Sequence, residues 1–256
     1  LGVDASYNLR YGDFKARISG YYTRIYDQSK VISYYDDVAA TFTNFAMSGI
    51  DKVHFGLEAA VSIPIYHTLA LNGAVSWGQY TYDSNPYYLQ TQDNSGDIVS
   101  DGYVYWKDFR VESTPQTAVN VGLSWRSNNN IYLSADFNYY NNMYLSMSPI
   151  YRTDAVITGG MAPGDIEHLR RQEKFDSAYT LNASIGKNWY IHRKYTLGFS
   201  LDVKNILNNQ DIKTGGYEQT RLSKNTETTV TTYQAFDSKY FYMFGTTYYL
   251  NLYFRF

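Results

Sequence analysis

The end of this 256-residue chain reads YYLNLYFRF, in which apolar residues occupy every second position. Leu250, Leu252, Phe254 and Phe256 alternate there with polar or amphipathic residues. Successive side chains of a β-strand point to opposite faces, whereas the apolar side of a helix recurs every three or four residues. The spacing therefore predicts a final strand with one apolar face and one polar face.

The same alternation recurs along the whole chain and predicts about nine strands of the length that a tilted transmembrane strand needs. In one strict run, Asp202 alternates with Leu201 and Val203, so that the polar face carries charge. Few soluble cores would accept such a face, and the pattern favours strands between lipid and a polar lumen. The predicted strands are 2–9, 14–29, 53–65, 69–82, 119–125, 131–139, 179–185, 195–203 and 248–256.

Short and long connections alternate between these strands. The short ones lie at 11–13, 66–68, 128–130 and 192–194, and the long ones at 30–52, 83–116, 146–174 and 208–239. Outer-membrane barrels pair short periplasmic turns with long extracellular loops. We therefore expect an all-β fold, a transmembrane antiparallel β-barrel, with Phe256 at its periplasmic rim in the bacterial outer membrane.

Composition agrees with strands and excludes several other classes. The chain holds 29 tyrosines, and its aromatic residues lie beside the predicted turns and loops, as the girdles of a barrel do. No apolar run approaches the roughly 18 residues of a spanning helix. A net charge of −2 gives no basic field for nucleic acid, and the absence of cysteine excludes disulfides and thiolate metal sites.

No catalytic or metal-binding motif stands out. The histidines His54, His67, His168 and His192 are scattered, without metal-ligand spacing, and residues 93–97 resemble half a calcium loop that lacks its closing glutamate. We expect no enzyme activity, no cofactor and no metal. The charged residues of the polar face could line a solute path, although any barrel interior holds such side chains. These residues are Glu58, Arg126, Asp136, Asp202, Lys204 and Arg255.

The long connection 83–116 holds the best candidates for ligand contact. Tyr103, Tyr105 and Trp106 can stack on planar or sugar faces, and Arg110 can bind carboxylates through two hydrogen bonds. The competing interpretation is that these aromatic side chains fold the loop onto itself.

Three segments resemble the end of the TonB-dependent outer-membrane receptors of Bacteroidetes. They are the run SLDVKNILNN at 200–209, the run GGYE at 215–218, and the final strand. The resemblance implies that residues 1–256 are the C-terminal part of a barrel of about 22 strands. It also implies that Leu250, Leu252, Phe254 and Phe256 form a barrel-assembly signal, and that the plug domain and the N-terminal strands lie outside this chain.

The resemblance further implies a function. The TonB complex would act through the plug to drive import of a bulky nutrient such as a glycan, peptide, siderophore or vitamin, with outer-membrane lipid and a surface lipoprotein as further partners. Other functions stay open: a stand-alone porin or adhesin barrel, an outer-membrane enzyme, and a soluble β-sandwich lectin. The first of these is the main alternative.

Overall fold

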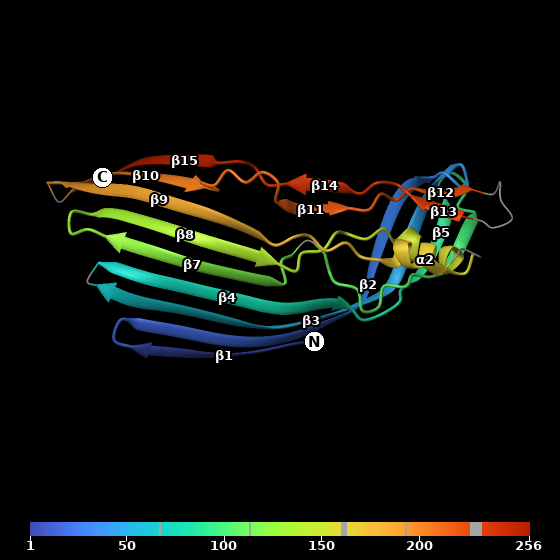
Figure 1. Ribbon diagram of the computed structural model, residues 1–256, viewed down its shortest axis with the longest axis horizontal. Coiled ribbons are helices and arrows are strands. Elements are labelled where there is room, and N and C mark those ends of the chain that lie inside the picture. Colours follow the sequence, from blue (N-terminus) through green and yellow to red (C-terminus); the bar gives the residue numbers. More distant parts are fainter. Residues whose placement is uncertain (67, 113, 160–162, 193, 226–231) are drawn as a thin grey trace.

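Nine long antiparallel strands lie side by side in chain order and form the main path of an 11-stranded sheet, whose other two strands are 87–92 and 98–103 (Figure 1). The computed structural model describes residues 1–66, 68–112, 114–159, 163–192, 194–225 and 232–256. This large antiparallel sheet confirms the predicted all-β class. Its strands are β1 (Gly2–Tyr11), β2 (Phe14–Asp36), β3 (Thr41–Tyr66), β4 (Leu69–Tyr82), β7 (Thr117–Arg126), β8 (Ile131–Asn141), β9 (Ala178–Ile191), β10 (Tyr195–Lys204) and β15 (Thr247–Arg255).

The register places the alternating apolar residues on one face of the sheet, from β1 to β15. Val121 pairs with Gly73 and Phe137, and Leu201 pairs with Ile185 and Leu250. Directly paired residues share a face, so the apolar stripes of neighbouring strands join. Side chains of this apolar face are exposed: Val121 is 46% exposed and Leu250 is 60% exposed. In the described part of the chain, therefore, no second layer of protein covers it.

The opposite face of the sheet is polar. Its side chains bond across the strands: the Asn120 amide donates to Asn138 at 2.9 Å, and the hydroxyls of Ser134 and Ser184 lie 2.7 Å apart. The register puts the charged residues that the sequence assigned to one face together on this polar face. They are Glu58, Arg126, Asp136, Asp202, Lys204 and Arg255.

The sheet has two free borders. Among the described strands, β1 pairs with β2 alone and β15 with β10 alone. Figure 1 shows these strands at opposite borders of the sheet. The structure thus contains a large open sheet of long strands.

The two short connections that the structure describes completely, 11–13 and 128–130, lie where the sequence predicts them, at the same end of the sheet (Figure 1). Gly12, in the first of them, has a φ of +59°, a conformation that glycine adopts without steric cost. Asn130 closes the other, where its backbone N–H donates to the Ser127 carbonyl at 3.1 Å. Residues 67 and 193, in the second and fourth predicted turns, lie outside the described residues.

The long connections contain secondary structure that the sequence reading did not predict. Residues 30–52 continue β2 and β3 as a paired hairpin beyond a register shift at 25–30, so the prediction of a loop there was wrong. The alternation of Thr43, Phe45 and Met47 faces a separate core at the loop end. The other elements are β5 (Tyr87–Gln92), β6 (Ile98–Tyr103), η1 (Pro149–Arg152), α1 (Asp154–Ile157), α2 (Pro163–Arg170), β11 (Lys213–Tyr217), β12 (Leu222–Asn225), β13 (Thr232–Ala235) and β14 (Lys239–Tyr242).

Most of these elements pack around a core of their own, at the end of the sheet away from the short turns (Figure 1). Phe45 stacks on Tyr88 with ring centroids 4.6 Å apart, and Tyr82 lies 4.7 Å from Trp106. We call this cluster the loop core. Its buried members are Phe45, Met47, Ile50, Tyr82, Tyr88, Val104, Trp106, Met147, Ile150, Tyr151, Val156, Leu169 and Leu222. Tyr240 of β14 packs instead against a second, smaller cluster that includes Leu145, Phe175 and Ile212.

Candidate ligand-binding loops

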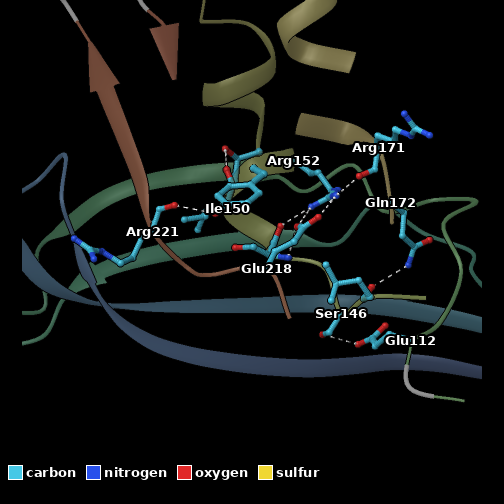
Figure 2. A network of polar contacts seen from close by, with 12 residues as sticks. Glu112, Ser146, Ile150, Arg152, Arg171, Gln172, Glu218 and Arg221 are labelled. Carbon is cyan, nitrogen blue, oxygen red and sulfur yellow. Dashed lines mark hydrogen bonds and ion pairs between the residues drawn. The ribbon is translucent and has the colours of Figure 1, made fainter. Parts of the chain in front are cut away.

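A buried ion pair holds the loop end together (Figure 2). The Arg152 side chain is 0% exposed, and its Nη1 and Nη2 donate to the two carboxylate oxygens of Glu218 at 2.5 and 2.8 Å. The same guanidinium donates to the carbonyls of Ser148, at 3.0 Å, and Arg171, at 3.3 Å. Arg152 ends η1 and Arg171 follows α2 in the β8–β9 connection, whereas Glu218 follows β11 in the β10–β15 connection, so one side chain joins two connections.

This pair has a structural role because solvent does not reach Arg152. The interaction of a guanidinium with a carboxylate through two parallel hydrogen bonds is both strong and geometrically specific. Glu218 also accepts a hydrogen bond from the Ser148 backbone N–H at 2.8 Å, so its charge is compensated from two sides. The pair fixes the positions of the loops and offers no free charge to a ligand.

Further polar contacts surround this ion pair, and Figure 2 shows the one at the Arg221 carbonyl. The Gln172 amide exchanges hydrogen bonds with the backbone of Arg110, at 2.9 and 2.8 Å. The buried Tyr151 hydroxyl donates to the Arg221 carbonyl at 2.9 Å, and burial raises its pKa to about 12. The Arg221 guanidinium binds Asp37 of the β2–β3 hairpin tip at 3.0 Å and holds the pKa of that carboxyl below its usual value. Segments distant in sequence are therefore fastened to one another.

The structure separates the four residues that the sequence proposed as ligand contacts. Tyr103 is 53% exposed and Tyr105 is partly exposed. Trp106 is 1% exposed and belongs to the loop core, so its ring faces protein. Arg110 is partly exposed, with its backbone held by Gln172. Two aromatic rings of the proposed set therefore remain accessible.

A third accessible ring, which sequence reasoning missed, adjoins Tyr103. Tyr87 pairs with Tyr103 across β5 and β6, and their ring centroids lie 5.6 Å apart, edge to face. The Tyr87 hydroxyl donates to Asp101 at 2.5 Å. We call Tyr87, Tyr103 and Tyr105 the aromatic ledge. The turn-forming run Asp-Asn-Ser-Gly-Asp at 93–97 was the signal that could have predicted a hairpin between 87–92 and 98–103.

Charged groups border the aromatic ledge. Asp154, which begins α1, accepts the Tyr103 backbone N–H at 2.6 Å, and its carboxylate raises the pKa of the Tyr105 phenol by hydrogen bonding. The Arg170 guanidinium lies 5.8 Å from the centre of the Tyr105 ring. Aromatic faces beside carboxylate acceptors and a guanidinium donor can stack on a ring-shaped ligand and bond its hydroxyl, amide or acidic groups.

The four residues of the predicted assembly signal lie at the border of the sheet. Leu250, Leu252 and Phe254 belong to the apolar face of β15, and Phe256, just after the strand, is 91% exposed. Phe254 stacks on Tyr195 with ring centroids 5.7 Å apart.

The structure shows no metal-binding group of three or more His, Asp or Glu residues within the described ranges. His54 lies on the polar face beside Tyr80, His168 lies in α2, and His192 lies in a short turn. His67 is outside the described residues. No helix among the described residues is long and apolar enough to cross a membrane.

Comparison with known proteins identifies no relative: no family model, no curated protein and no solved structure matches this chain.

Proposed function

We propose that this chain spans the bacterial outer membrane as part of a transport or receptor barrel that imports a bulky nutrient. The observation that supports this proposal best is the apolar face of the sheet, which continues across nine strands, stays exposed, and has a polar face behind it. Soluble monomers rarely expose apolar patches larger than a few hundred Å². Hydrocarbon on one side and a water-filled or plugged lumen on the other accounts for both faces.

Strand length supports the same proposal. β7 and β10 each have 10 residues and β15 has 9, against the roughly 9–11 residues that cross a bilayer at a tilt of about 45°. β2 and β3 are longer, but their additional residues belong to the loop end.

The free borders of the sheet favour a larger barrel. An unpaired strand edge in lipid leaves backbone N–H and C=O groups without partners, at a cost of several kcal/mol for each group. Further strands of the same barrel would pair with β1 and β15 and remove this cost. The resemblance to TonB-dependent receptors supplies the rest of the proposal, namely an internal plug, energy from the TonB complex, and capture of the nutrient by the loop end.

Lipid contact can be tested with single cysteines, because the chain contains none of its own. Leu123 lies on the apolar face and its neighbour Ser124 on the polar face, so Leu123→Cys and Ser124→Cys form a matched pair. In the full gene product, reconstituted in vesicles and labelled with an environment-sensitive dye, nitroxide lipids should quench the dye at position 123 and spare the dye at 124. Equal quenching at the two positions contradicts the proposal.

Transport is tested in the host bacterium. A strain that lacks this gene and a strain that lacks TonB should fail to take up the same nutrient from a panel of glycans, peptides, siderophores and vitamins. Normal uptake in the strain without TonB, combined with loss in the strain without this gene, would identify a passive porin instead.

A further inference from the structure

Lys187 is an unusual residue on the apolar face of the sheet. It pairs with Ile131 on one side and with Phe199 on the other, in a row that continues to Leu252. Consider the part of the apolar face between the Arg24–Val53 pair and the short turns. Among the described residues, the register puts no charged residue there except Lys187.

Arg24 and Lys187 differ in how their charges are compensated. Arg24 forms an ion pair with Asp83 at 2.7 Å, whereas no described carboxylate lies within ion-pair distance of Lys187. An uncompensated cation on a lipid-facing strand is destabilising at the centre of a bilayer and becomes tolerable near the interface. A second group, outside the chain, would complete the environment of Lys187.

The Lys187 ammonium group lies beside an aromatic side chain of the same strand. Its Nζ lies 5.3 Å from the centre of the Trp189 ring, which is two residues closer to the turn. Trp189 is 41% exposed and packs against Phe199 at 6.0 Å. From Lys187 to the end of β9 is four residues, about 13 Å at the usual strand rise. Lys187 and Trp189 therefore lie in the part of the apolar face that is near the short-turn rim.

A second ammonium group lies at the same rim. Lys194, which is exposed, places its Nζ 5.3 Å from the centre of the Tyr195 ring. Tyr195 in turn stacks on Phe254 of β15. Trp189 and Tyr195 occupy neighbouring strands and successive rows of one face, so their Cα atoms lie about 8 Å apart. Both cations therefore border one patch of exposed aromatic surface.

We propose that this patch binds an anionic glycerophospholipid, with Lys187 and Lys194 as donors to its phosphate and with its acyl chains on Phe199, Leu252 and Phe254. The proposal rests on the membrane insertion proposed above. An ammonium group held over an aromatic ring still has N–H donors for an anion. Phospholipid phosphate lies at the membrane interface, near which both lysines lie, and the acyl chains match the apolar row beneath.

The position of the patch separates it from nutrient binding. It lies at the short-turn end and on the apolar face, whereas the aromatic ledge lies at the loop end. The lipid would fasten the β9–β10 hairpin and the border strand β15 to the membrane interface. Lys15 provides a matched control, because it lies near the same end of the sheet but on the polar face, where it pairs with Arg10 and Ser62.

Native mass spectrometry of the full gene product in detergent tests the proposal. With phosphatidylglycerol added, the wild-type protein and Lys15→Gln should retain the lipid equally. The double variant Lys187→Gln/Lys194→Gln should bind it more weakly, by at least about fivefold on the usual strength of one lysine at an anionic membrane surface. The double arginine variant should restore retention, because it keeps both charges.

Three results would overturn the inference. They are unchanged lipid retention in the double glutamine variant, an equal loss in Lys15→Gln, and displacement of the lipid by millimolar inorganic phosphate, which indicates a site for free anions. If the dye at position 123 reports lipid contact while lipid retention is unchanged, the headgroup site alone fails. If the dye reports no lipid contact, the proposed function fails first.

Discussion

The guanidinium of Arg152 and the carboxylate of Glu218, 66 residues apart in the chain, meet inside the folded loops through two parallel hydrogen bonds. A pair of this kind depends on both partners, because removal of one leaves the other charge buried and uncompensated. The pair therefore fastens the β8–β9 connection to the β10–β15 connection.

Removing one partner of this pair should loosen the loop end. We expect Arg152→Ala to destabilise it by about 3–5 kcal/mol, and the double change Arg152→Met/Glu218→Leu to cost much less, because no charge is left buried. Limited proteolysis read by mass spectrometry checks this, with cleavage in 83–116, 146–174 and 208–239 as the signal and the nine-strand sheet as the internal reference. Equal cleavage in the single and double variants would argue against a buried-charge effect.

We expect Trp106 to stabilise the loop core through packing and not through a hydrogen bond. Its indole N–H is buried and has no hydrogen-bond acceptor among the described residues. Trp106→Phe should therefore be mild, whereas Trp106→Ala should destabilise the loop core by about 3–5 kcal/mol through the cavity that it leaves. Hydrogen exchange of the β5–β6 hairpin measures both effects. Equal damage in the phenylalanine and alanine variants would show that the N–H does form a stabilising hydrogen bond.

The loop end should lose stability at high pH. Burial raises the pKa of Tyr151 from 10.0 to about 12, so between these values the unfolded chain releases a proton that the folded protein keeps. Stability from this group is complete below pH 10 and falls as the pH rises toward 12. Tyr151→Phe should make hydrogen exchange of the loops less dependent on pH across this window. Identical pH profiles would show that the phenol does not titrate on opening.

The aromatic ledge should contribute to ligand capture. Tyr87 and Tyr103 are both exposed, so Tyr87→Ser/Tyr103→Ser should leave folding intact and weaken nutrient uptake by about tenfold, the effect of losing roughly 1.4 kcal/mol of stacking. Tyr35→Ser is the matched control, because Tyr35 is an exposed tyrosine of the β2–β3 hairpin, outside the ledge. Saturation curves in cells measure the shift. An equal shift in the control would indicate a general surface effect.

Local sequence was sufficient for the sheet itself. The positions of Leu197, Phe199 and Leu201 in β10 follow from alternation, which reports the two environments of a strand directly. The sequence prediction failed at Phe45 and Met47, which were assigned to a loop. These residues also alternate in a strand, but they lie beyond a register shift and face the loop core. Alternation identifies a strand and its two faces but not the material that each face meets.

The candidate site depended more heavily on tertiary structure. Tyr103 and Trp106 are equivalent as aromatic residues of one segment, yet one is exposed and the other is in the loop core. Asp154 and Arg170 reach the aromatic ledge from another connection. Such meetings depend on how distant segments pack, and no local pattern encodes them.

The sequence by itself determined the nine-strand meander, its apolar and polar faces and the end at which its turns are short, because each of these depends on neighbours within a few residues. Only the tertiary structure decided that the long connections pack around a core of their own, that Arg152 meets Glu218 there, and that Lys187 and Lys194 border one aromatic patch. Those contacts join residues that are far apart in the sequence. They depend on packing and charge compensation in three dimensions, which no short stretch of sequence specifies.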